Sequence, residues 1–250
     1  MLPEYPELLL VVSFLALCAA TAMGTWVSRR YPADEAMHHD FGLVLGAALT
    51  MLALIVGFSF SMAAGRYEQR RDLEGVEANT IGTEYQRADL LPPAEGAAVK
   101  ALLKSYADLR IQFYTVVEGD ELEKIEKRTE KVQQELWAAM LPVAAAHPTP
   151  IVALIVTGMN EALDSQSSVQ AAWHNRIPTG AWCLLAIMSF GSVFFLGYGF
   201  RSNLAVRRLS FAMPLLVSVA LGLIADIDSP RRGIIRVQPQ NLLELAETMQ

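Results

Sequence analysis

The sequence predicts an all-α integral membrane protein with four transmembrane helices and a helical cytoplasmic bundle between the second and third. Two observations predict this fold class: the spacing of the apolar residues, and the absence of sustained strand-like alternation. A helix needs about 20 apolar residues to cross about 30 Å of hydrocarbon. Three hydrophobic stretches reach that length and a fourth nearly does. They lie in two pairs, separated by a long polar segment, at residues 8–27, 41–64, 180–200 and 209–225.

The composition agrees with a membrane protein. The chain has 250 residues, of which 53% are hydrophobic and only 18% are charged, whereas soluble domains carry about 25% charged residues. A formal net charge of −6 gives no basic excess of the kind that nucleic-acid binding requires. Cys18 and Cys183 both lie inside hydrophobic stretches, so we expect neither a disulfide nor a zinc site.

The first hydrophobic stretch is expected to stay in the mature protein. A cleaved signal peptide has a positively charged start, whereas residues 1–7 are acidic and contain no Lys or Arg. The predicted parts of the chain are then a first membrane pair, a helical insert, a second membrane pair and a tail, at residues 1–64, 65–178, 179–228 and 229–250.

The polar insert reads as a series of helices. The second membrane stretch runs into polar sequence without a breaker, so we expect one continuous helix that ends at Pro92-Pro93. Apolar residues at helical spacing, such as Leu102, Tyr106, Leu109 and Phe113, then predict further amphipathic helices. These are expected at about residues 94–117, 121–141 and 151–173, with a break at Pro142.

The insert offers no defensible catalytic or metal-binding set. His38 and His39 could bind a metal but have no third ligand nearby, and a solvated loop is the simpler interpretation. Asn160, Glu161 and Asp164 could bind a cation or form an exposed helix face. There is no phosphate loop, nucleophile elbow or zinc-protease motif. We therefore expect no enzyme activity, no cofactor and no metal.

Basic residues near the membrane ends suggest the orientation. Four crossings place both termini and the insert on one side, and the positive-inside rule makes the more basic side cytoplasmic. The insert side carries Arg66, Arg70, Arg71, Arg176, Arg231, Arg232 and Arg236, and the other side carries Arg29, Arg30, Arg201, Arg207 and Arg208. The margin is narrow, but it favours a cytoplasmic insert with cytoplasmic termini.

Several short motifs resemble those of one family. The run Gly57-Phe58-Ser59-Phe60, followed by Arg66-Tyr67, resembles the bestrophin pattern of Gly-Phe-Tyr-Val and then Arg with an aromatic residue. The wider block 57–92, the segment 226–236 and Asn175-Arg-Ile-Pro178 look like the bacterial bestrophin-like membrane proteins. Together with the four-helix layout, this resemblance covers nearly the whole chain and implies a bacterial inner-membrane location.

The resemblance implies a channel. Bestrophins are pentameric ion channels, mostly anion-selective, and their second membrane helix lines a narrow apolar neck. The matching positions are Thr50, Leu54 and Phe58, and residues spaced by four form one stripe of a helix. A ring of such side chains can gate ions by dewetting. Thr50 departs from an apolar neck, and Phe60 and Ser61, expected on a different face, could line the pore if the register differs.

The charged residues near the helix ends could have either a structural role or a role in binding ions. Arg66, Arg70 and Arg71 could anchor the pore helix at the interface or attract anions. The acidic calcium-binding run of animal bestrophins is reduced to Asp226 and Asp228, so we do not expect calcium gating. These two carboxylates could cap the membrane helix or pair with nearby arginines, or they could bind an ion.

Two functions of different classes follow from the sequence. The favoured one is an oligomeric ion channel, anion-conducting and pentameric, whose partners are the lipid bilayer, permeant ions and further copies of the chain. The alternative is a membrane-anchored scaffold or sensor whose insert binds a partner, with helices packed through small residues such as Gly42 and Gly46. A transporter is less favoured because no internal repeat or broken helix is visible.

Overall fold

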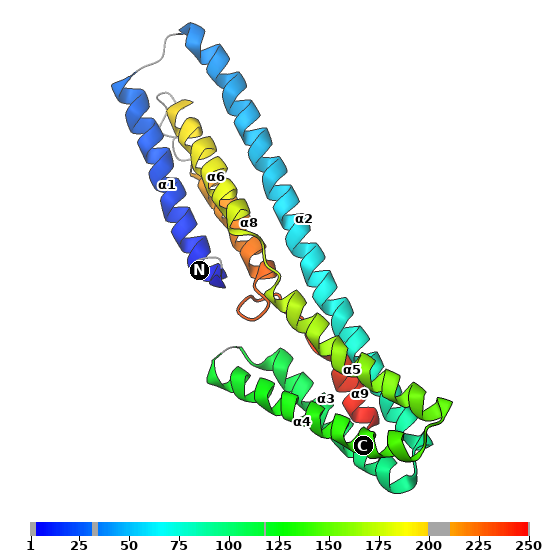
Figure 1. Ribbon diagram of the computed structural model, residues 1–250. Coiled ribbons are helices and arrows are strands. Elements are labelled where there is room, and N and C mark those ends of the chain that lie inside the picture. Colours follow the sequence, from blue (N-terminus) through cyan, green and yellow to red (C-terminus); the bar gives the residue numbers. More distant parts are fainter. Residues whose placement is uncertain (1–3, 32–34, 118, 200–210, 250) are drawn as a thin grey trace. The chain divides into compact units, whose positions relative to one another are not determined.

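The computed structural model describes residues 4–31, 35–117, 119–199 and 211–249, and every regular element in these ranges is a helix. The side chains of residues 35–39, including His38 and His39, are outside the described part, as are residues 200–210 with Arg201, Arg207 and Arg208. The elements are α1 (Pro6–Arg30), α2 (Glu35–Arg87), the 3₁₀ turn η2 (Ala88–Leu90), α3 (Pro93–Thr115), α4 (Asp120–Ala146), α5 (Pro150–His174), α6 (Thr179–Gly199), α8 (Ala212–Asp228) and α9 (Gln240–Thr248) (Figure 1).

The chain divides into two compact units. The first, here called the membrane unit, comprises Met1–Arg66 and Arg176–Ile235; the second, the polar unit, comprises Tyr67–Asn175 and Arg236–Gln250. Helix α2 contributes its N-terminal part to the membrane unit and its C-terminal part to the polar unit.

Three helical segments of the described residues are long and apolar enough to cross a membrane: Pro6–Arg30, Asp40–Leu90 and Pro150–Gly199. Helix α8 has 17 described residues, which corresponds to about 26 Å at 1.5 Å per residue. The first three predicted crossings therefore have matching helices, while the fourth stays a prediction.

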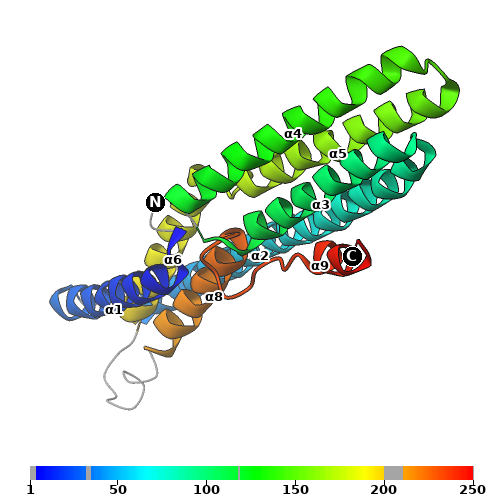
Figure 2. The same cartoon turned by 90° about the horizontal axis from the view of Figure 1, so that it is seen from below.

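Helices α1, α6 and α8 pack against one another in the membrane unit (Figures 1 and 2). Small residues bring α1 and α6 together: a Cβ added to Gly24 would lie 2.2 Å from the Phe194 carbonyl oxygen. In the same way, a Cβ on Gly197 would lie 2.3 Å from the Thr21 carbonyl oxygen. Glycine at these two sites lets the backbones approach closely, as is common between membrane helices.

The continuous second helix predicted from the sequence is confirmed. Helix α2 has 53 residues, about 80 Å at 1.5 Å per residue. The turn η2 follows α2 directly, and α3 then begins at Pro93. The polar helices α3, α4 and α5 begin within one residue of their predicted starts. Thr149 caps α5 by accepting a hydrogen bond from the Val152 N–H at 3.3 Å.

One local prediction was wrong, and one helix was not predicted. Pro142 was expected to break the third polar helix, but it lies inside α4, which continues to Ala146. Proline removes one backbone donor near the helix end, and burial of Val143 keeps the last turn packed. No helix was predicted in the C-terminal tail, which contains the nine-residue helix α9, whose Leu242 is fully buried.

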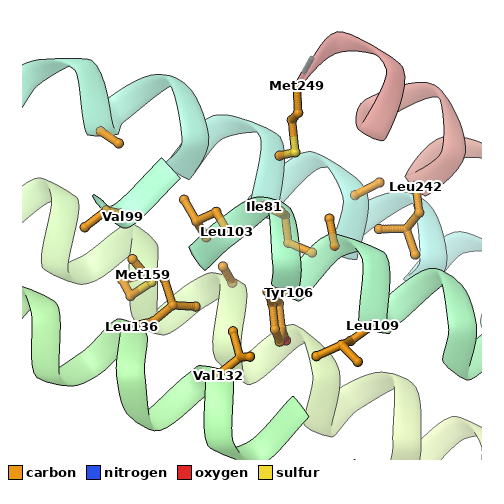
Figure 3. Packing of buried hydrophobic residues seen from close by; sticks show 14 of the residues in the cluster. Ile81, Val99, Leu103, Tyr106, Leu109, Val132, Leu136, Met159, Leu242 and Met249 are labelled. Atoms are coloured by element: carbon orange, nitrogen blue, oxygen red, sulfur yellow. The ribbon is translucent and has the colours of Figure 1, made fainter. Parts of the chain in front are cut away.

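The polar unit has a hydrophobic core shared by its helices. Figure 3 shows Ile81 of α2 and Leu103 of α3 in the same cluster as Leu136 of α4 and Met159 of α5, and none of these four side chains exposes more than 1% of its surface. The α3 residues Leu102, Tyr106, Leu109 and Phe113, singled out by their spacing, all belong to this core or pack against it. The predicted amphipathic faces are thereby confirmed for α3.

Candidate functional site

The membrane part of α2 is packed on one side only. Leu52, Ser59 and Ala63 are buried, and Leu52 belongs to a small hydrophobic cluster with residues such as Leu185 and Val193 of α6. The Ser192 hydroxyl also donates a hydrogen bond to the Ala48 carbonyl oxygen at 3.3 Å. One face of α2 is therefore held by α6.

The opposite side of α2 is uncovered within the described chain. Thr50, Leu54, Gly57 and Ser61 are all exposed, and with 3.6 residues per turn their directions differ from that of Thr50 by no more than about 40°. A Cβ added to Gly57 would meet no described atom within 4 Å. We call these four residues the exposed α2 face.

The predicted neck residues all lie on this uncovered side. Leu54 exposes 55% of its side chain and Phe58 exposes 64%. Helical periodicity turns Phe58 by about 80° from Thr50, so Phe58 lies at the edge of the exposed α2 face. The neck function of Thr50, Leu54 and Phe58 stays a prediction.

The two alternative pore residues do not share one direction. Phe60 is 41% exposed and points about 80° from Thr50, on the side opposite to Phe58. Ser61 points within about 20° of Thr50, although we expected it on a different face. The reason is the helical repeat: eleven residues make just over three full turns, so Ser61 points in nearly the same direction as Thr50, whereas each four-residue step turns the direction by about 40° further.

The Thr50 hydroxyl is directed toward its own helix. It donates a hydrogen bond to the Gly46 carbonyl oxygen at 2.8 Å, a common way for Thr to satisfy its donor inside a helix. Because the hydroxyl proton is used in this bond, Thr50 exposes only its methyl group and the lone pairs of its oxygen. The polar departure from an apolar neck is therefore smaller than the residue type alone suggests.

Arg66 and two acidic residues in the last turn of α8 hold the end of the membrane unit together. Arg66 Nη1 lies 3.7 Å from Asp228 Oδ1, and both Asp228 oxygens accept from the Ile177 N–H at 3.1 Å. Asp226 accepts from the N–H groups of Ile234 at 2.6 Å and Ile235 at 2.9 Å. The structure thus gives both carboxylates a backbone partner.

The other two basic residues have different environments. Arg70 is 1% exposed and donates to the carbonyl oxygens of Ala172 at 3.2 Å and Asn175 at 3.1 Å, which end α5. A cation is favourable at a helix C-terminus. Arg71 is exposed and lines a polar cavity of about 390 Å³ together with Glu74 and Arg236. Whether Arg66, Arg70 and Arg71 anchor the helix or attract anions stays a prediction.

Sequence reasoning missed a set of buried charges in the polar unit. Arg110 Nε donates to Glu77 Oε1 at 2.5 Å, and the Tyr114 hydroxyl donates to Glu77 Oε2 at 3.0 Å. Glu84 is also buried, and Arg87 Nη1 lies 3.6 Å from its Oε2. The sequence contained an indication of this: Glu77 and Glu84 lie four residues before and three residues after Ile81, so they share a helix face with an apolar residue.

Among the described residues, no group of three or more His, Cys, Asp or Glu side chains could hold a metal ion. Asn160, Glu161 and Asp164, the other cation candidates, are exposed on α5.

The bestrophin-like domain model matches residues 15–242. The chain belongs to this family. The resemblance read from its motifs is therefore confirmed, and it extends over both units of the bestrophin-like chain. No curated protein matched it.

Solved structures agree with this assignment at the level of the fold. A bestrophin homologue from Klebsiella pneumoniae is 15% identical, with a TM-score of 0.64 over 96% of this chain and 94% of that one. A tryptophan-to-alanine variant of the Klebsiella protein is 14% identical, with a TM-score of 0.65 over 95% and 97% of the two chains. At such identities the bestrophin-like chain shares a fold with these proteins.

Proposed function

We propose that this bestrophin-like protein is one subunit of an oligomeric ion channel that conducts anions. Characterised members of the family are ion channels, and the observation that carries the proposal is the exposed α2 face. The uncovered apolar side of a membrane helix must be covered either by lipid or by further copies of the protein. A ring of copies would place these faces around a common axis.

The proposed gate is an apolar constriction at Thr50, Leu54 and Phe58. Narrow pores lined by apolar side chains exclude water and so block ions until they widen. Glycines at 46 and 57 on the same side of the helix leave room near the axis, because a Cβ on either would meet no described atom within 4 Å. Arg66, Arg70 and Arg71 would then lie beyond the inner end of the constriction, where they anchor the helix or attract anions.

The proposed assembly is a pentamer in the bacterial inner membrane. Four crossings place both termini and the polar unit in the cytoplasm, in keeping with the basic residues on that side. Closed rotational symmetry is the usual arrangement for a membrane pore made of one kind of subunit. No catalytic chemistry is part of this function.

Ion flux from liposomes containing the purified protein tests the proposal. Leu54→Ala and Phe58→Ala are expected to increase flux severalfold, because each widens the constriction. The control is Ile187→Ala, at a side chain on α6 that is 69% exposed and is expected to face lipid. The permeability ratio of chloride to sodium, taken from reversal potentials, tests the anion preference.

The outcomes are distinct. Flux that is absent from the parent protein and from both neck variants would contradict the channel and favour a membrane-anchored scaffold. Flux that is present but unchanged by both substitutions would reject the neck residues only. A monomer by native mass spectrometry would reject the assembly on which the pore depends.

A further inference from the structure

The membrane unit contains an elongated apolar cavity between α1, α6 and α8. Its volume is about 620 Å³, which lies within the range of about 300–1,000 Å³ for ligand pockets. Val12 and Ala16 of α1 form one wall, and Ala186 and Phe190 of α6 form another. This cavity does not involve the exposed α2 face, so it needs a separate explanation.

The depth of the cavity corresponds to one membrane leaflet. Its α6 lining runs from Thr179 to Phe190, which is about 16 Å at 1.5 Å per residue. One leaflet is half of the hydrocarbon core of about 30 Å. A guest that follows the full cavity therefore has the length of a lipid acyl chain lying parallel to the helices.

Three charged residues line the cavity, Glu4, Arg176 and Asp228; Asp228 is bound by Arg66 and the Ile177 N–H, and the other two form a pair. Arg176 Nη1 lies 3.5 Å from Glu4 Oε1, and the two side chains remain 32% and 41% exposed. The guanidinium matches a phosphodiester oxygen, and the carboxylate matches a primary ammonium group. A zwitterionic headgroup that carries both groups complements both residues at once.

We propose that this cavity binds one acyl chain of a phosphatidylethanolamine molecule, with the headgroup at Glu4 and Arg176. The apolar walls select for a chain, but they cannot select one lipid from another, since every lipid tail is equally apolar. The choice between lipids rests on this charged pair. Anionic phosphatidylglycerol would satisfy Arg176 and oppose Glu4, so it binds more weakly.

Native mass spectrometry of the intact protein in detergent, with phosphatidylethanolamine added, measures this binding. We expect one retained lipid for each protomer. Ala186→Trp fills the cavity and should weaken binding about tenfold or more. Arg176→Gln removes one charge-assisted hydrogen bond, which also corresponds to about tenfold. Ile187→Trp is the matched control on the same helix and should retain the lipid, because Ile187 does not line the cavity.

A second measurement uses Cys183, an exposed free thiol that lines the cavity. In a Cys18→Ala background, added phosphatidylethanolamine should slow maleimide labelling of Cys183 severalfold, and the Arg176→Gln variant should lose this protection. This readout keeps the proposal testable even where Ala186→Trp fails to fold.

Three results would overturn the proposal. Equal lipid retention by Ala186→Trp and Ile187→Trp would place the lipid elsewhere. Stronger retention of phosphatidylglycerol than of phosphatidylethanolamine would reject the zwitterionic headgroup. Loss of the oligomer in Ala186→Trp, with no lipid retained by the parent, would show that a second copy of the chain fills the cavity.

Discussion

Glu77 and Arg110 form an ion pair that is almost completely shielded from solvent, with 2.5 Å between Oε1 and Nε and side-chain exposures of 0% and 1%. The pair joins α2 to α3 in the polar unit. Burial raises the pKa of Glu77, while Arg110 and Tyr114 lower it. The Arg110 guanidinium also lies 4.4 Å from the centre of the Phe113 ring, so its flat face is occupied as well.

Arg110→Leu is expected to destabilise the protein strongly. Removing one partner of a buried pair leaves the other charge uncompensated, at a cost of about 3–5 kcal/mol. Thermal unfolding of the full-length protein in detergent measures the loss. The control is Lys127→Ala, which breaks an exposed pair with Glu123 and should change stability by less than about 1 kcal/mol. Similar unfolding temperatures for the two variants would contradict a structural role for Arg110.

Gly197→Ala is expected to disturb the packing of α1 against α6. Its Cβ would lie 2.3 Å from the Thr21 carbonyl oxygen, a backbone atom that cannot move alone. Overpacking of this kind costs about 1–3 kcal/mol. Gly191→Ala on the same helix is the control, because its Cβ meets nothing within 4 Å and alanine favours the helix. A loss of thermal stability in both variants alike would reject the close approach as the cause.

Glu84 should make the stability of the polar unit depend on pH. Burial raises its pKa to about 7, with Glu161 adding to the rise and Arg87 opposing it. A carboxyl whose folded pKa lies above its unfolded value binds its proton more tightly when folded. Its contribution therefore destabilises the fold above pH 7, and this destabilisation disappears as the pH falls from about 7 toward about 4.5.

Glu84→Gln tests this dependence. Since one pKa unit corresponds to about 1.4 kcal/mol, the variant should be more stable than the parent at pH 8 by about 1–3 kcal/mol, and the difference should vanish near pH 5. Unfolding temperatures recorded across that range give the comparison. Glu68→Gln, which removes an exposed carboxylate from the same helix, is the control. A constant difference between Glu84→Gln and the parent at every pH would contradict a raised pKa.

Cysteine accessibility should distinguish the directions around α2. In a background with Cys18→Ala and Cys183→Ala, single cysteines at 54 and 61 should react with a small water-soluble thiosulfonate and change ion flux. A cysteine at buried position 52 should not react, and one at 60, which is turned away from the proposed pore axis, should also be protected and leave flux unchanged. Flux changes at 60 but not at 61 would show that the other side of α2 faces the pore.

The helices could largely be predicted from the sequence because their signals are local. Apolar spacing, the Pro92-Pro93 pair and Pro150 determine α3 and the start of α5. Helix α9 was missed because nine residues give too short a pattern, and its Leu242 is buried by contacts from distant parts of the chain. Leu242 N–H donates to Glu74 at 3.0 Å, a contact across 168 residues that no local pattern indicates.

The candidate site was only partly predictable. The resemblance to bestrophins pointed to Thr50, Leu54 and Phe58 as neck positions, but the side of α2 that packs on α6 could not be known before Leu52 was seen in its cluster. The lipid-sized cavity was missed altogether, because Glu4 and Arg176 are brought together by the pairing of α1 with α6. Such meetings depend on tertiary packing and leave no local pattern.

The last turn of α8 joins segments that are distant in the sequence. Asp226 accepts two backbone N–H groups, from Ile234 and Ile235, and Asp228 accepts a third, from Ile177. The three amides lie before α6 and after α8, so the two carboxylates tie the end of α8 to segments on both sides of it along the chain. Hydrogen bonds made within the chain can therefore hold this corner of the fold in shape.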